Sequence, residues 1–333
     1  MNDNNYIIQI KNLCVSYLTE KNLFSLKSDK IVAVNDISLD ITKGTTTGLV
    51  GESGCGKSTI AKAMLRLFNK GLNDVEIKGD INLLFEENPI NILKLSKKEM
   101  RKLRKHIQII FQDPSSSLNP RFPVGKIIEE PLIYNTSLVK KERIERVLFL
   151  LEKVGISTDK YSSYPYEFSG GQKQRISIAR ALASGPELII CDEPVSSLDV
   201  SIQAQIINLL MDLQKDFNLS ILFISHDISV VKQISRNILV MYMGKIIESG
   251  EASKIYFNSV HPYTKLLICS IPGYISKNDT VIPLIENSEN IHRHSSCSFV
   301  SRCSLAQNIC NENEPRLEKI AENHYAACFF CRK

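Results

Sequence analysis

The chain has 333 residues, of which 43% are hydrophobic and 23% charged, a composition that is ordinary for a soluble globular protein of one large domain plus an appendage or of two modest domains. The net charge of +5 comes from 41 basic and 36 acidic residues without a concentrated basic block, so we expect no nucleic-acid partner. No apolar run approaches the roughly 18–20 residues of a membrane span, and the N-terminal stretch lacks a signal-peptide pattern. We therefore expect a cytosolic chain with reduced thiols.

Short apolar runs and amphipathic stretches alternate along the chain. The expected strands lie at residues 6–10, 37–41, 45–50, 107–111, 187–191 and 220–225, and the expected helices at 97–105, 140–154 and 171–183. A polar, lysine-rich stretch at 19–30 indicates a surface insertion. Strands that alternate with helices predict a mainly parallel, doubly wound sheet. The pattern changes after Phe257, which predicts one domain over 6–257 and an extension over 258–333.

The stretch GESGCGKS at residues 51–58 follows an apolar strand and opens a helix. It fits the P-loop pattern G-x-x-x-x-G-K followed by Ser or Thr, whose glycines let backbone N–H groups surround phosphates. Lys57 can reach the β- and γ-phosphates, and Ser58 can offer its hydroxyl to Mg²⁺. The residues expected at the nucleotide are Gly51, Glu52, Ser53, Gly54, Cys55, Gly56, Lys57, Ser58 and Thr59.

The stretch LIICDEP at residues 188–194 is an apolar run that ends in two acids. Asp192 at the strand end is expected to hold Mg²⁺, directly or through water. Glu193 is expected to orient or deprotonate the attacking water. These two motifs indicate nucleotide hydrolysis, and the absence of an N-K-x-D pattern weighs against a GTPase.

The stretch FSGGQKQR at residues 168–175 resembles the signature sequence of the ABC ATPases. Other motifs of that family follow in the expected order: Tyr17 before the P-loop, Gln112 after a strand, SSLD at 196–199, and His226 in ISHD. The resemblance covers residues 6–257. It implies an α/β fold of the P-loop NTPase class in its ABC form, a RecA-like core with antiparallel β and helical subdomains, followed by a short Cys-rich extension.

The same resemblance implies a head-to-tail dimer that sandwiches ATP between two subunits. Ser169, Gly170, Gly171 and Gln172 would then contact ATP bound to the partner, and Asp199 would act across the interface. The catalytic residues would be Glu193, His226 and Gln112, and Tyr17 would stack on adenine. The Mg²⁺ ligands would be Ser58, Gln112 and Asp192.

Two further stretches resemble the oligopeptide and dipeptide importers: QDPSSSLNPR at 112–121 and HPYTKLLICSIP at 261–272. They imply an ATPase subunit peripheral to the cytoplasmic face of the membrane. Its partners would be a second, different ATPase subunit, two transmembrane permease subunits and, indirectly, a substrate-binding protein. The alternatives are an importer of nickel or a nickel chelate, and a soluble ABC ATPase without a transport role.

Five of the nine cysteines crowd into the tail between residues 297 and 331. The importer ATPases that the chain resembles carry such a motif, which implies a 4Fe–4S cluster held by Cys297, Cys303, Cys310 and Cys328. Tetrahedral zinc is the second interpretation, although its structural sites favour closer cysteine pairs. Unpaired cytosolic thiols are the third.

Overall fold

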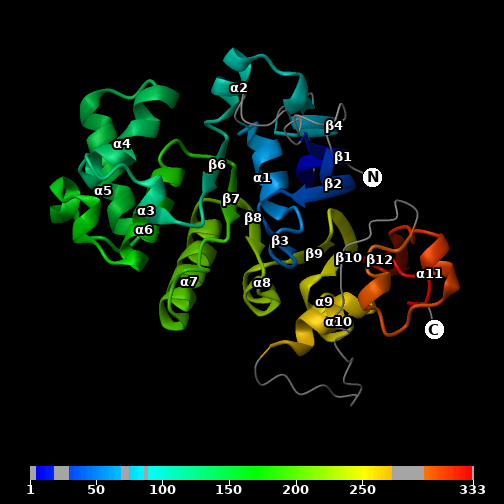
Figure 1. Ribbon diagram of the computed structural model, residues 1–333. Coiled ribbons are helices and arrows are strands. Elements are labelled where there is room, and N and C mark those ends of the chain that lie inside the picture. The colour runs from blue at the N-terminus through cyan, green and yellow to red at the C-terminus, as the bar shows by residue number, and fades with distance from the viewer. Residues whose placement is uncertain (1–4, 19–29, 69–74, 86–88, 272–295, 332–333) are drawn as a thin grey trace, which may run out of the picture.

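The computed structural model describes residues 5–18, 30–68, 75–85, 89–271 and 296–331 (Figure 1). Most of the predicted insertion at 19–30 therefore lies outside the described residues. The larger sheet has eight strands in the order β11-β12-β10-β9-β3-β8-β7-β6. These strands are β3 (Thr46–Val50), β6 (Ile107–Ile110), β7 (Leu188–Asp192), β8 (Ser220–Ser225), β9 (Asn237–Tyr242), β10 (Lys245–Glu251), β11 (Glu318–Ala321) and β12 (His324–Ala326).

The centre of this sheet is parallel, from β9 through β3, β8 and β7 to β6, and the last three strands add on antiparallel. Every residue of β3 and β8 is buried, as expected for strands covered on both faces. Gly48 of β3 is needed there because a Cβ would lie 2.1 Å from Cγ1 of Val231 on α8 (Ile228–Ile234). The predicted parallel core is thus confirmed.

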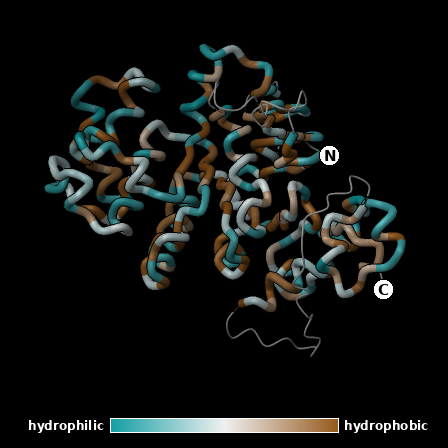
Figure 2. The backbone as a smooth tube through the Cα atoms, in the orientation of Figure 1, coloured by the Kyte–Doolittle hydropathy of each residue, from teal (hydrophilic) through white to brown (hydrophobic). Residues whose placement is uncertain are grey.

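A second, antiparallel sheet has the order β2-β1-β4-β5. Its strands are β1 (Tyr6–Leu18), β2 (Lys30–Thr42), β4 (Val75–Leu83) and β5 (Ile90–Asn91). One hydrophobic cluster lies between this sheet, the larger sheet and α1 (Lys57–Leu65), and a second joins the larger sheet to the other helices. Hydrophobic segments accordingly run through the middle of the molecule (Figure 2).

Among the remaining helices, two groups lie toward opposite ends of the larger sheet. α3, α4, α5 and α6 gather beyond the β6 edge, whereas α9, α10 and α11 lie toward the opposite edge (Figure 1). Their bounds are α2 (Lys97–Leu103), α3 (Pro114–Ser117), α4 (Val124–Asn135), α5 (Lys140–Lys153), α6 (Gly170–Leu182), α7 (Val200–Asp216), α9 (Ala252–Phe257), α10 (Pro262–Cys269) and α11 (Asn308–Glu312). Short 3-10 turns are η2 (Ile92–Lys94), η3 (Thr158–Ser162), η4 (Pro165–Glu167) and η5 (Val300–Arg302).

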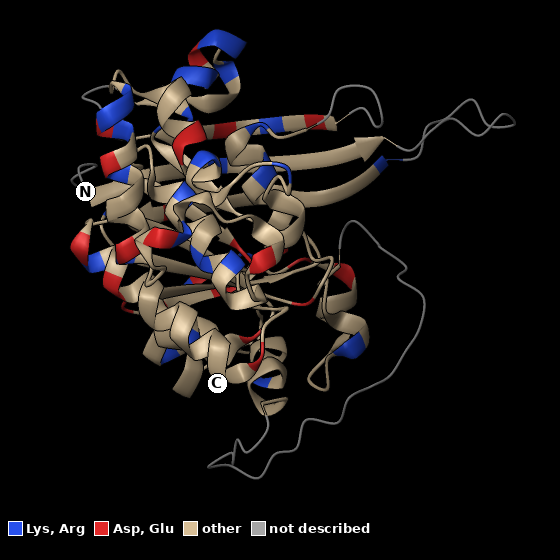
Figure 3. Ribbon diagram, turned by 90° about the vertical axis from the view of Figure 1, so that its left-hand side faces the viewer, with Lys and Arg blue, Asp and Glu red and all other residues tan. Residues whose placement is uncertain are grey.

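Charged residues of both signs are distributed over many elements of the fold, and basic residues gather on α2 (Figure 3). Among the described residues, no helix has the length and apolar character that crossing a bilayer requires. The segment over 296–331 is attached through sheet pairing, because β12 extends the larger sheet beside β10.

Candidate nucleotide-binding site

The P-loop connects the end of β3 to the first turn of α1. The Lys57 ammonium is buried and donates hydrogen bonds to the carbonyl oxygens of Gly51 (2.7 Å) and Glu52 (2.8 Å). Gly56 has φ 110°, and a Cβ there would lie 2.3 Å from the carbonyl oxygen of Ala33, so only glycine lets the loop turn this close to β2. The loop thus forms a cradle with a helix N-terminus and a buried cation, which suits an anion.

Two predicted Mg²⁺ ligands meet beside the loop. The Ser58 hydroxyl donates a hydrogen bond of 2.8 Å to Oδ1 of Asp192, which ends β7. Burial raises the pKa of the Asp192 carboxyl, and the neighbouring Glu193 adds to the shift. Burial and a neighbouring carboxylate both disfavour its charge, so a cation here would be stabilising. Hydroxyl and carboxylate oxygens are the donor type that Mg²⁺ prefers, so these residues fit that ion.

Three predicted catalytic side chains converge from the ends of three neighbouring strands. Nε2 of Gln112, after β6, donates to Oε2 of Glu193 at 3.3 Å and to the Ser196 hydroxyl at 3.2 Å. Nδ1 of His226, after β8, lies 3.2 Å from the same Glu193 oxygen. Carboxyl ends of parallel strands meet at one sheet edge, which explains why motifs far apart in sequence gather here.

Tyr17 lies on β1 close to the start of α1. Its hydroxyl is 3.3 Å from the Thr59 hydroxyl, and its ring packs edge-on against Phe68 with centroids 6.3 Å apart. An aromatic ring therefore stands next to the P-loop helix, in the region where the resemblance expects adenine.

The signature residues open α6. The Ser169 hydroxyl accepts from the N–H of Gln172 at 3.3 Å, and the Gln172 side chain accepts from the N–H of Ser169 at 3.0 Å. This capping box fixes the helix N-terminus while Ser169 and Gly170 stay exposed. Asp199 stands just before α7 as its N-cap residue and is also exposed. The signature and Asp199 thus present free surface to a neighbouring molecule.

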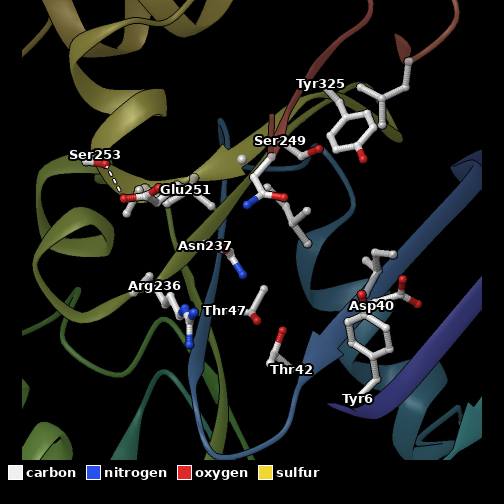
Figure 4. A pocket seen from close by; sticks show the side chains of 18 of the residues that line it. Tyr6, Asp40, Thr42, Thr47, Arg236, Asn237, Ser249, Glu251, Ser253 and Tyr325 are labelled. Carbon is white, nitrogen blue, oxygen red and sulfur yellow. Dashed lines mark hydrogen bonds between the residues drawn. The ribbon is translucent and has the colours of Figure 1, made fainter. Parts of the chain in front are cut away.

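A separate hollow of about 940 Å³ lies at the opposite, amino ends of the parallel strands (Figure 4). Its walls include Tyr6, Thr47, Asn237 and Tyr325, and none of the predicted site residues lines it.

The predicted cysteine metal centre was wrong. Among the described residues, no group of three or more His, Cys, Asp or Glu side chains is arranged to hold a metal ion. Burial raises the pKa of Cys297 to about 11, and burial also raises the pKa values of Cys303 and Cys328. Cys310 is buried, and Cys297 and Cys303 pack against the main hydrophobic cluster.

Sequence reasoning also missed two contacts on the P-loop from the end of the chain. The Tyr263 hydroxyl accepts from the N–H of Glu52 at 2.9 Å, and the Arg302 guanidinium pairs with the Glu52 carboxylate. Neither contact has a local signal, because the partners are separated by 211 and 250 positions in the chain.

The fold and this arrangement of motifs define an ATPase of the ABC class. A solved structure of CbiO1 from Clostridium perfringens, part of an ABC transporter complex, superposes with a TM-score of 0.63 at 29% identity, covering 76% of this chain and 92% of that one. MJ0796, described as a bacterial ABC transporter cassette with a dimeric structure, gives a TM-score of 0.61 at 27% identity over 74% of this chain and 98% of its own.

Two family models match parts of the chain. The ABC transporter model matches residues 34–196, and the model of the C-terminal region of oligopeptide/dipeptide transporters matches residues 247–310. The oligopeptide transport ATP-binding protein AppF of Bacillus subtilis is 43% identical over 97% of this chain and 96% of its own length. The dipeptide transport ATP-binding protein DppF of Haemophilus influenzae is 43% identical over 94% and 93%. The chain therefore belongs to the family of oligopeptide/dipeptide transport ATP-binding proteins within the ABC transporters.

Proposed function

We propose that this chain binds and hydrolyses ATP to energise an ABC importer of oligopeptides or dipeptides. The observation that carries the proposal is the convergence of Gln112, Glu193 and His226 beside the Ser58–Asp192 pair at the mouth of the P-loop. The relatives whose names state oligopeptide or dipeptide transport support the cargo class. They favour peptides over the nickel alternative, and they favour transport over a soluble role.

We assign each side chain a role in hydrolysis from its position. Lys57 and the N–H groups of the P-loop would hold the phosphates, and Ser58 and Asp192 would hold Mg²⁺, which would supply positive charge beside them. Glu193 accepts a proton from water as the water oxygen bonds to the γ-phosphorus and the bond to the bridging oxygen of ADP breaks. The products are ADP and phosphate. Gln112 and His226 orient Glu193, because both contact its Oε2.

The site is completed by a second subunit. The exposed N-terminus of α6, with Ser169, Gly170, Gly171 and Gln172, would meet ATP held by the partner, while Asp199 meets the partner across the interface. ATP binding would then favour the closed dimer, and hydrolysis would let the dimer open again, so the nucleotide shifts the equilibrium between two conformations. The dimeric structure of the MJ0796 cassette supports this arrangement.

The remaining partners follow from the transporter role. The chain would bind two transmembrane permease subunits at the cytoplasmic face, a second and different ATPase subunit, and no nucleic acid. A substrate-binding protein would act indirectly through the permeases. The division into 6–257 and 258–333 stays a prediction.

The test uses the assembled transporter in membrane vesicles. Replacing Lys57 with Ala removes the cation that faces the phosphates, so ATP-dependent uptake of a labelled tripeptide should fall to background. Labelled Ni²⁺ serves as the competing cargo in the same assay. Normal peptide uptake by the Lys57→Ala complex would refute the P-loop assignment, and uptake of Ni²⁺ without peptide would favour the alternative.

A further inference from the structure

The second residue of the P-loop is held from the C-terminal end of the chain at three atoms. Both nitrogens of the Arg302 fork, Nη1 and Nη2, donate to the two Glu52 carboxylate oxygens at 2.9 Å each. The backbone N–H of Glu52 donates to the hydroxyl of Tyr263 on α10 at 2.9 Å. A two-pronged pair of this kind fixes direction as well as distance, so the side chain and the backbone of Glu52 are both restrained.

Arg302 is itself positioned by aromatic rings. Its guanidinium carbon lies 5.9 Å from the ring centroid of Tyr242 on β9 and 5.8 Å from that of Phe299. Tyr242, Tyr263 and Phe299 contact one another with centroids 4.6 to 5.5 Å apart, and Phe299 is buried. Phe299 and Arg302 both belong to residues 296–331, the C-terminal segment, so the docking of that segment decides where the guanidinium lies.

This position has consequences for the phosphate cradle. The carbonyl oxygen of Glu52 accepts from the Lys57 ammonium, so Arg302, Tyr263 and Lys57 all act on one residue of the loop. An unpaired Glu52 carboxylate would add negative charge to a site that receives a polyanion, and Arg302 cancels that charge. Restraint and neutralisation both favour a loop shaped for phosphates.

We propose that two parts of the chain beyond β10, α10 with Tyr263 and the C-terminal segment with Arg302, set the ATP affinity of this chain by holding Glu52 of the P-loop. Arg302 is a positioning residue, since it acts through Glu52. The proposal rests on the proposed role of the P-loop as the nucleotide site. Coupling is reciprocal, so ATP must in turn tighten the attachment of the segment around Phe299–Arg302.

The test titrates the full-length chain with Mg·ATP. Arg302→Ala should weaken ATP binding by roughly threefold to tenfold, because a partly exposed but bidentate pair is lost and Glu52 is left unpaired. Adding Glu52→Gln should recover part of that loss, since the uncompensated charge is gone. Arg302→Lys keeps the charge but not the two-pronged geometry, so its ATP affinity should lie between those of the unaltered chain and Arg302→Ala. If Arg302→Ala does not fold, Arg302→Lys is used in its place. In the assembled transporter, KM for ATP should rise by the same factor with a smaller change in kcat.

The matched control is Lys245→Ala. Lys245 pairs with Glu314 and so ties the same C-terminal segment to β10 through an ion pair that includes no residue of the P-loop. The Lys245→Ala chain should bind ATP as tightly as the unaltered chain. An equal loss of ATP affinity in Lys245→Ala and Arg302→Ala would overturn the role of Arg302. Amide hydrogen exchange at 299–302 should slow on adding Mg·ATP, but not in Arg302→Ala.

Two failures are distinguishable. Unchanged ATP affinity in Arg302→Ala and Arg302→Lys, with binding abolished by Lys57→Ala, overturns the proposal and leaves the nucleotide site standing. Unchanged affinity in Lys57→Ala overturns the nucleotide site itself.

Discussion

Glu193 adopts a backbone conformation that few residues other than glycine tolerate. Its φ is 50°, in the left-handed region, and its N–H is held by the carbonyl oxygen of Ile224 at 3.0 Å. The side chain is then shared between Gln112 and His226. Backbone strain of this kind persists only where the surrounding structure imposes it.

Replacing Glu193 with Gln should separate binding from chemistry. The amide keeps the size of the side chain but cannot accept the proton of water, so ATP hydrolysis by the assembled transporter should fall by about 10²–10⁴. ATP binding should persist and closed dimers should accumulate, which size-exclusion chromatography with Mg·ATP measures. Unchanged hydrolysis would contradict the role given to Glu193.

His261 predicts a pH dependence of stability. Burial lowers its pKa from 6.5 to about 4, against the opposing influence of Glu248, and its Nδ1 accepts from the N–H of Tyr263. Between about pH 4 and pH 6.5, His261 is therefore protonated in the unfolded chain but not in the folded chain. This contribution to the free energy of unfolding is complete above pH 6.5 and falls by up to about 1.4 kcal/mol per pH unit toward pH 4.

The measurement is denaturant unfolding at pH 7.5 and pH 5. His261→Asn is the matched variant, because Asn retains an acceptor at the helix N-cap and does not titrate. It should lose less stability between the two pH values than the unaltered chain. An equal loss in both would place the pH dependence elsewhere.

At the scale of elements, the sequence correctly predicted the strands and the helix start that depend on local residue patterns. The runs before Asp192 and His226 are mainly apolar and fully buried, and they form β7 and β8, while the P-loop motif specified the β3–α1 junction. The ends of β1 and β2 were missed, because register shifts near Ile10 and Leu13 break the alternation of buried and exposed residues. β1 continues to Leu18 rather than ending at residue 10, and β2 begins at Lys30 rather than at residue 37.

The C-terminal elements could not be predicted, since long-range contacts stabilise them. β12 is three residues long and depends on its pairing with β10. The cysteines of the tail suggested a set of metal ligands. The tail is instead stabilised by the burial of Phe299 and Cys310 and by the pairing of β12 with β10. His324 is likewise buried against Glu248, 76 positions earlier in the chain.

His324→Ala should detach β12. Nε2 of His324 lies 2.8 Å from Oε1 of the fully buried Glu248, whose two oxygens also accept from the N–H groups of Val260 and His261. Removing one partner of such a buried group should cost about 3 kcal/mol in the free energy of unfolding. Lys254→Ala, at an exposed contact with the carbonyl of Glu322, is the control and should change little. A loss below about 1 kcal/mol would contradict a structural role for the pair.

At the scale of the whole molecule, the P-loop and the signature use the same physics for different partners. Each is a helix N-terminus rich in glycine, and each can attract phosphate oxygens. The P-loop is contacted by Tyr17 and by Arg302 of the C-terminal segment, whereas Ser169 and Gly170 are exposed beside α7. One subunit therefore has a phosphate cradle and an exposed helix N-terminus, which a head-to-tail pair would bring together.

Gly170→Asp tests that pairing. A Cβ at Gly170 meets only Cδ2 of Leu198 at 3.5 Å, an ordinary contact, and a carboxylate is favourable in the first turn of a helix, so the chain should fold normally. It should also bind ATP at its own P-loop as before. In the assembled transporter, however, the added charge would face the γ-phosphate held by the partner, and hydrolysis at that site should fall at least about tenfold. Gly170→Asn, neutral and of the same size, should retain most activity. A matching loss in both variants would indicate a steric effect, and full activity of the Asp variant would contradict the head-to-tail arrangement.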